Sequence, residues 1–258
     1  MLLEQGEWGP LNQGIGARDS SNVHFDSKGI LWIFFGRNPT ATVNHVWNYD
    51  IQNDLWRWVL GFNTSEQYSF WGTRGVAGLD VYPGYLRNSQ SAIDKSDNIW
   101  FFGARTGAAT NALFHYNTTS NEFTWIDGGV GSDRTDEPSQ GEFRIASPDV
   151  WPGPTGFGCM LRDSADNLWL IGGRAQGDDP FGSSQNAVYH YNTTSGWWSW
   201  VDGDPTGFTS TNVTAGIFGG RNGVACTIDN DDRIWLFSGS LIDTDYNDLW
   251  SYDTETLQ

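Results

Sequence analysis

The residues best suited to metal or nucleophilic chemistry in this 258-residue chain are four histidines and two cysteines. His115 and His190 stand at the same place in two related segments, each flanked by aromatic residues, so two imidazoles could hold a metal ion. We prefer the plainer interpretation, a histidine hydrogen-bonded between two repeating units. No nucleophile elbow, phosphate loop or sialidase box is present. The sequence therefore predicts no catalytic residue, no cofactor and no metal site.

The two cysteines are too few for a disulfide framework or a zinc site. Cys159 and Cys226 align with each other in the first strands expected in two consecutive units. A bond between them would need Cα atoms within about 7 Å, and we expect neighbouring first strands to lie farther apart. The prediction is two small buried side chains, with a disulfide as the open alternative.

Charged residues also recur at fixed places. One turn opens four times with an aspartate: Asp26, Asp94, Asp163 and Asp229. Such a side chain can bond its own backbone, and the sequence after Asp229 lacks the glycine and distal Glu of an EF-hand. Arginines follow a repeated tryptophan by five residues at Arg37, Arg105 and Arg174. We interpret them as structural ties, because a net charge of −17 opposes the alternative, an arginine ring that binds an anion.

These residues belong to a repeat with a period of about 68 residues. A tryptophan follows each aspartate turn, at Trp32, Trp100, Trp169 and Trp235. Next come an Asn-x-x-x-x-Tyr block, first at 44–49, and a block such as Trp56-Arg-Trp58, which the last unit lacks. Each unit reads as four strands, and no stretch shows sustained helical periodicity. The pattern predicts an all-β propeller with units at about 16–60, 85–126, 156–201 and 220–258 and long loops at 61–84, 127–155 and 202–219.

The Trp, Asn-x-x-x-x-Tyr and Trp-x-Trp blocks resemble those of kelch-repeat β-propellers, in particular a long-repeat subset similar to the central domain of galactose oxidase. The resemblance covers nearly the whole chain, although the kelch diglycine is intact only at Gly172-Gly173. It implies four-stranded blades and a binding role. Nothing matches the copper ligands of galactose oxidase residue by residue. We also expect the propeller to be incomplete, with more sequence or a partner chain beside it.

Four Asn-x-Ser/Thr sites predict possible glycan acceptors: Asn63, Asn117, Asn192 and Asn212. Asn117 and Asn192 fall in the same turn of two units, where the other units have Asp50 and Asp253. This placement favours an extracellular or cell-surface location, although no signal peptide pattern begins the chain. A cytoplasmic location is the alternative.

Aromatic residues in the long loops are the candidate binding residues, because loops on a rigid scaffold carry function. Those singled out are Trp71, Tyr82, Trp151 and Phe208. They suit stacking on a sugar or a neighbouring subunit, or else they fold back over the blade ends. The acidic composition excludes nucleic acid as a partner, and the longest apolar run, 30–35, is too short to insert in a membrane.

The most consistent function is a non-catalytic extracellular module that binds protein or glycan. Such a module could be a glycosylated subunit of a cell-surface or filamentous assembly that includes copies of itself. The alternatives are an intracellular kelch adaptor and a propeller enzyme of the oxidase or glycosidase type.

Overall fold

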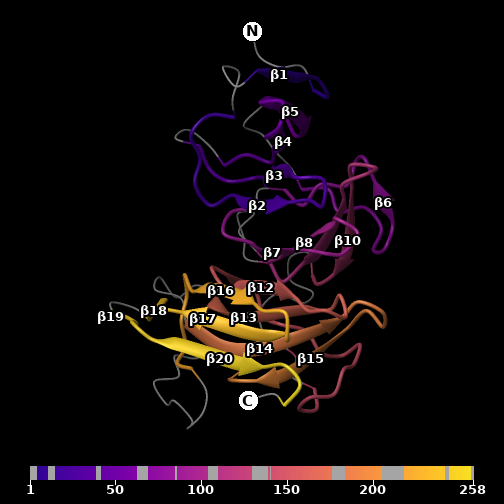
Figure 1. Cartoon of the computed structure of the whole chain (residues 1–258). Coiled ribbons are helices and arrows are strands. Elements are labelled where there is room, and N and C mark those ends of the chain that lie inside the picture. The colour runs from indigo at the N-terminus through magenta and orange to yellow at the C-terminus, as the bar shows by residue number, and fades with distance from the viewer. Residues whose placement is uncertain are drawn as a thin grey trace.

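The computed structural model describes residues 5–10, 15–38, 42–62, 69–84, 86–103, 110–129, 139, 141–175, 184–204, 218–241 and 244–256. Every regular element in these ranges is a β-strand. Four antiparallel sheets are arranged as the blades of a four-bladed β-propeller (Figure 1). The predicted all-β propeller fold is confirmed, and the repeated blocks of the sequence form corresponding strands in successive blades.

The first two blades have five strands each. Blade 1 contains β1 (Trp8–Pro10), β2 (Asn22–Phe25), β3 (Ile30–Phe34), β4 (Val46–Asp50) and β5 (Leu55–Leu60), in the order β1-β5-β4-β3-β2. Blade 2 contains β6 (Ala77–Gly78), β7 (Gln90–Ile93), β8 (Ile99–Phe102), β9 (Leu113–Asn117) and β10 (Glu122–Asp127), in the order β6-β10-β9-β8-β7. The aspartate turn joins the inner strand of each blade, β2 or β7, to the strand that carries the repeated tryptophan.

The last two blades follow the same plan. Blade 3 contains β11 (Thr155–Gly156), β12 (Cys159–Arg162), β13 (Leu168–Ala175), β14 (Ser184–Asn192) and β15 (Trp197–Asp202), with β11 and β12 both paired to β13. Blade 4 contains β16 (Ala225–Ile228), β17 (Arg233–Phe237) and β20 (Leu249–Asp253), in that order. A small ribbon of β18 (Ser240–Leu241) and β19 (Thr244–Asp245) lies between β17 and β20 in the chain.

Two of the outer strands come from segments outside the predicted blade units. β1 pairs with β5, and β6, which falls in the predicted loop 61–84, pairs with β10. A short strand at this place covers an edge that would otherwise present unpaired backbone groups. The parts of these segments next to a blade are therefore structural.

The core lies between the blades. Separate buried clusters join blade 1 to blade 2, blade 2 to blade 3, and blade 3 to blade 4. At each interface the repeated tryptophan meets the repeated tyrosine of the following blade. The ring centroids are 5.9 Å apart for Trp32 and Tyr116, 6.0 Å for Trp100 and Tyr191, and 6.2 Å for Trp169 and Tyr252. The tryptophan repeat is thus a repeat of blade-to-blade contacts.

The diglycine position is a β-bulge at the end of the tryptophan strand. Gly172 and Gly173 have φ values of 58° and 101°, and the register of β13 and β14 shifts between Ile171 and Gly173. A Cβ on Gly173 would lie 2.5 Å from the Thr155 hydroxyl oxygen. In blade 3 the second position therefore requires glycine. The first tolerates other residues, since Phe35 has a φ of 58° at the equivalent place in blade 1.

Candidate functional site

The inner strands of all four blades line one cavity at the propeller axis. β2 lies beside β7, β7 beside β12, and β12 beside β16. The cavity has a volume of about 740 Å³ and is lined by residues 21–24, 89–93 and 158–162 together with Val224, Cys226 and Ile228. A pocket of this size matches those that hold small ligands in other proteins, typically about 300–1,000 Å³.

Hydrogen bonds tie the first two inner strands together at this cavity. The Asn22 side-chain amide donates to the Ser89 carbonyl oxygen at 2.9 Å and to Ser91 Oγ at 2.8 Å. His24 Nε2 lies 2.7 Å from the same Ser91 Oγ. Burial lowers the pKa of His24 to about 4, so its imidazole is neutral at physiological pH. The described lining contains no Asp or Glu. Within that lining, the His24–Ser91 pair therefore has no carboxylate that could complete a catalytic triad.

Arg162 lines the other side of the cavity. Its Nε donates to the Ile93 carbonyl oxygen at 3.0 Å, which joins blade 3 to blade 2. Its Nη1 lies 3.6 Å from Asp166 Oδ1. Arg162 is the one Arg or Lys in the described lining, and it gives the cavity a cationic group in a strongly acidic protein.

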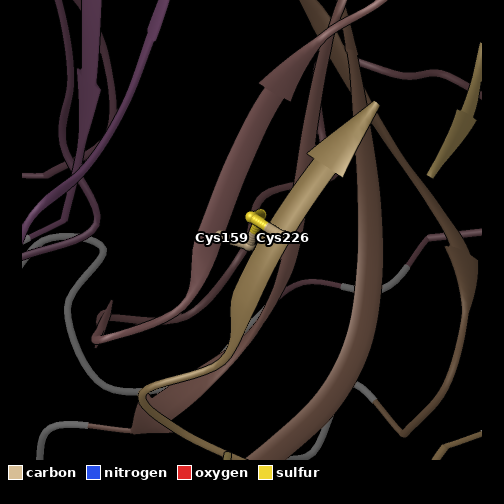
Figure 2. The surroundings of a disulfide bond; sticks show 2 residues. All are labelled: Cys159 and Cys226. Carbon is tan, nitrogen blue, oxygen red and sulfur yellow. A yellow bond between two sulfur atoms is a disulfide. The ribbon is translucent and has the colours of Figure 1, made fainter. Parts of the chain in front are cut away.

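Cys159 and Cys226 form a disulfide between the inner strands of blades 3 and 4 (Figure 2). Their Cα atoms are 6.4 Å apart, within the range that a disulfide spans. The prediction of two unbonded buried side chains was therefore wrong. Neighbouring inner strands come closer at this point than we expected.

The register of the strands explains the disulfide. Cys159 pairs with Ile171, two residues after the blade 3 tryptophan, whereas Cys226 pairs with Leu236, one residue after the blade 4 tryptophan. The cysteines are thus one position out of alignment, and a one-residue offset turns a strand side chain to the opposite face. Cys159 faces blade 4 and Cys226 faces blade 3. Counting from each cysteine to its tryptophan, ten residues against nine, would have revealed this.

The aspartate turns hold the repeated tryptophans in place. In blade 3, Asp163 Oδ1 accepts the backbone N–H of Ala165 at 3.0 Å and of Asn167 at 2.8 Å, and Oδ2 accepts Trp169 Nε1 at 3.0 Å. The corresponding tryptophan bonds measure 3.0, 3.0 and 2.8 Å in blades 1, 2 and 4. The turn bond was expected, but the tryptophan bond was missed. The constant six-residue spacing was its signal.

The two aligned histidines belong to the same arrangement. His115 Nε2 lies 3.7 Å from Asp94 Oδ2, and its ring is 4.6 Å from the Trp100 ring. Burial alone would raise the pKa of Asp94, but the neighbouring His115 imidazole and the hydrogen bond from the Asn98 backbone outweigh it and lower the pKa to about 2. His190 does the same for Asp163. Both partners lie in the histidine's own blade, whereas we expected a contact between blades.

The sequence raised two possible metal sites, the aligned histidines and the aspartate turns, and both lie in the part of the chain that the structure describes. No group of three or more His, Cys, Asp and Glu side chains there is arranged to hold a metal ion. The aspartate turns use their carboxylate oxygens on backbone and indole N–H groups instead. Each turn therefore has a structural explanation.

Two of the predicted glycan acceptors lie in turns that the structure describes. Asn117 ends β9, and its Oδ1 accepts the backbone N–H of Thr119 and Ser120, both at 2.9 Å. Asn192 ends β14 and makes the same bonds to Thr194 and Ser195, at 3.0 and 2.9 Å. The bonds leave the side-chain nitrogen, the atom that a glycan would modify, outside the turn bonds. Asn63 and Asn212 lie outside the described residues.

The aromatic residues predicted to bind a ligand lie in different environments. Trp71 is buried in the core between blades 1 and 2, with its ring 5.0 Å from that of Phe114, so it faces away from solvent. Tyr82 is half-buried and lies 4.9 Å from the exposed Phe62 ring. Trp151 is half-buried and pairs with Ser139. Phe208 lies outside the described residues. Of the described residues among them, Trp71, Tyr82 and Trp151, none lines the axial cavity.

Two of the arginines that follow the repeated tryptophan, Arg37 and Arg174, do not line the cavity. Arg37 is exposed and pairs through its backbone with Asp19, and Arg174 is part of β13. Arg105 lies outside the described residues. Among the described residues the most buried arginine is Arg221, which donates to both carboxylate oxygens of Asp248, at 2.7 and 3.1 Å.

Comparison with known proteins leaves the fold as the basis for interpretation. No family model matches the chain, and no curated protein is significantly similar to it. In the described residues, no helix is long and apolar enough to cross a membrane. The inference about function therefore depends on the axial cavity, the disulfide and the blade surfaces.

Proposed function

We propose that this chain is a kelch-type β-propeller module that binds a protein or glycan ligand outside the cell without transforming it. The axial cavity carries the proposal, because strands from all four blades contribute to one pocket of ligand size. A ligand there would contact a rigid scaffold, since the inner strands are tied by side-chain hydrogen bonds and a disulfide. Rigid, preformed sites lose less entropy on binding.

The chemistry of the lining favours an extended peptide or a sugar chain. β2, β7, β12 and β16 each pair with one neighbour in their sheet, so their other edges present backbone donors and acceptors toward the axis. Such edges suit peptide backbone or sugar hydroxyl groups. The lining residues include Ser, Asn and His as well as apolar residues such as Ile93, and Arg162 offers a charge for a carboxylate.

The disulfide and the sequon turns support an extracellular location. Disulfides persist in oxidising compartments and are rare in the reducing cytosol. Asn117 and Asn192 occupy matching turns on blades 2 and 3, where they would carry glycans away from the cavity. A glycosylated propeller of this kind would remain free to bind at its axis.

Secretion from eukaryotic cells tests the compartment. The chain, directed to the secretory pathway, should gain mass that peptide N-glycosidase removes, and Asn117→Gln with Asn192→Gln should reduce that gain. Its thiols should resist alkylation until a reductant is added. Unmodified asparagines together with reactive thiols would favour the intracellular adaptor instead.

Arrays of immobilised glycans and peptides test the binding. We expect selective capture by some members, and we expect Arg162→Ala to weaken it. Arg233→Ala is the matched control, because Arg233 also pairs with an aspartate, Asp253, at 2.9 Å but does not line the cavity. If both variants lost the same amount of binding, the proposal that the ligand binds at the axis would be refuted. Turnover of a captured glycan would refute the proposal that binding occurs without catalysis.

A further inference from the structure

Each blade has two different faces, which we name by their repeat residues. The tryptophan face carries the repeated tryptophan and packs on the following blade. The tyrosine face carries the repeated tyrosine and packs on the preceding blade. Three such interfaces exist within the chain. The tryptophan face of blade 4 and the tyrosine face of blade 1 are left over.

The tryptophan face of blade 4 has the residue types of an interface, but they are exposed. Leu249 is 63% exposed, although Val46, Leu113 and Val188 at the same repeat position are each 0% exposed. Phe237 is 49% exposed. At its repeat position Phe34 and Phe102 are 0% exposed and Ile171 is 1% exposed. These positions are buried wherever a following blade covers them.

The tyrosine face of blade 1 is exposed at its inner strand and its repeated tyrosine, although Ile33 and Trp47 at its centre are buried within the blade. Tyr49 is half-buried, whereas its equivalents Tyr116, Tyr191 and Tyr252 are 0%, 3% and 5% exposed. On the inner strand of the same face, Val23 and Phe25 are 50% and 56% exposed. Stacking of Tyr49 on Trp56, with ring centroids 4.6 Å apart, already orders the outer part of this face.

Figure 1 shows blade 1 (indigo) at the opposite end of the molecule from blade 4 (yellow), and on both faces the residues Leu249, Phe237, Val23 and Phe25 are exposed. We propose that the tryptophan face of blade 4 docks on the tyrosine face of blade 1 of a second copy of this chain. Trp235 then lies against Tyr49 of the second copy, as Trp32 lies against Tyr116 within one chain. The docking continues an interface that the chain already forms three times.

The innermost contact fits this arrangement. At the first interface this place holds the Asn22–Ser91 hydrogen bond, and at the third it holds the Cys159–Cys226 disulfide. By strand register, the equivalent residues on the two free faces are Ala225 and Val23. Two apolar side chains would meet there, with no polar group left unpaired.

One polar contact of the internal interfaces is missing from the free faces. Ser27 of blade 1 donates through its backbone N–H and its hydroxyl to Asp97 of blade 2, at 2.8 and 2.6 Å. Ser164 N–H makes the same bond to Asp232 of blade 4 at 2.7 Å. Blade 1 has Gly29 at this acceptor position. Two docked copies would therefore lack this hydrogen bond. A substitution at Gly29 can introduce the missing acceptor.

Gly29→Asp is such a variant. The three aspartates at this position, Asp97, Asp166 and Asp232, have φ values of 64°, 72° and 56°, and Gly29 has a φ of 80°. A Cβ on Gly29 would meet nothing within 4 Å. The new carboxylate would accept hydrogen bonds from Asn230 of the second copy. We expect the dissociation constant of self-association to fall severalfold.

This contact is heterologous, so each copy keeps a free face for another copy and the assembly forms a ring or a filament. The net charge of −17 makes the copies repel one another. Salt screens that repulsion. Association should therefore strengthen as salt concentration rises, the opposite of an assembly held by ion pairs.

Sedimentation velocity on the full chain over a range of concentrations tests the proposal. We expect concentration-dependent association that Leu249→Glu weakens about tenfold or more, because a charge would be buried against an apolar face. Leu79→Glu is the matched control, since Leu79 is also 63% exposed but lies on neither face. If the chain stayed monomeric at every concentration, the proposal would be overturned. The two faces would then be contacts for another protein or for a further blade.

A mixing experiment tests the head-to-tail geometry. Leu249→Glu disables one face and Phe25→Glu the other, and both replaced side chains are exposed, so both variants should fold. Each variant alone should self-associate at least about tenfold more weakly than the unchanged chain. An equimolar mixture should form dimers and nothing larger, because it contains one intact face of each kind. Failure of the mixture to dimerise, or undiminished association of Leu249→Glu alone, would overturn the proposal.

Discussion

Asp163 accepts a hydrogen bond from the indole nitrogen of Trp169 at 3.0 Å, and the same bond recurs in every blade. The turn that begins a strand thereby fixes the ring that packs on the next blade. A local sequence motif of seven residues thus sets the geometry of a blade-to-blade interface.

Removal of this carboxylate should destabilise the propeller. Asp163→Ala breaks the bonds to Trp169 and to two backbone N–H groups at a buried site, so we expect a loss of about 3 kcal/mol in the free energy of unfolding. Asp229→Ala is the matched comparison, because Asp229 makes the same bonds at an exposed site. Its loss should be clearly smaller in urea denaturation. Equal losses would contradict the role that we give to burial.

Stability should fall at low pH because of the same carboxylates. The pKa values of Asp94 and Asp163 are about 2 in the folded chain, against an ordinary value of 3.8. Since the folded pKa is the lower one, the stabilisation is complete above about pH 4 and is lost as the pH falls toward 2, by about 1–2 kcal/mol for each residue. Urea midpoints measured from pH 6 to pH 2 check this. Asp163→Asn should flatten the decline, and an unchanged curve would argue against these groups.

Reduction of the disulfide should loosen blade 4 from blade 3. The bond joins residues 67 positions apart, so reduction should cost about 2–4 kcal/mol of unfolding free energy. Denaturation with and without reductant measures the change. The Cys159→Ala, Cys226→Ala double variant should be insensitive to reductant. A reductant effect of the same size in that variant would show that the effect arises elsewhere.

The bulge glycine should tolerate no side chain. Gly173→Ala places a Cβ 2.5 Å from the Thr155 hydroxyl at a φ of 101°, and we expect a loss of about 3 kcal/mol or more. Gly223→Ala is the control, because Gly223 also has a positive φ but open space around it, and should cost about 1 kcal/mol. Thermal or urea unfolding compares the two. If Gly223→Ala lowered the free energy of unfolding as much as Gly173→Ala, the effect would come from backbone strain alone and not from the contact with Thr155.

The sequence was sufficient to predict the blades, because the spacing of Trp32 and its equivalents repeats with the strands around them. It was insufficient wherever one residue of register decides which way a side chain points. Cys159 and Cys226 appeared aligned, yet their one-residue offset turns them toward each other. Register depends on pairing between strands, which spacing along one strand does not fix.

The loops were the least predictable part. Ala77–Gly78 forms an outer strand, although the segment has no alternating pattern that would mark one. Trp71 appeared to be a surface aromatic, but it fills the space between Phe114 and Trp125 in the core. The cavity was not anticipated either, because its lining combines inner strands of four blades that are far apart in the sequence. Only their arrangement around one axis brings them together.

Hydrogen–deuterium exchange, with and without a peptide or glycan captured on the array, tests most directly whether this propeller binds ligands on its axis. The account predicts slower exchange in β2, β7, β12 and β16, which line the cavity, with little change in the aromatic segments around Tyr82 and Trp151. Protection confined to those outer segments, with unchanged inner strands, would contradict binding at the axis.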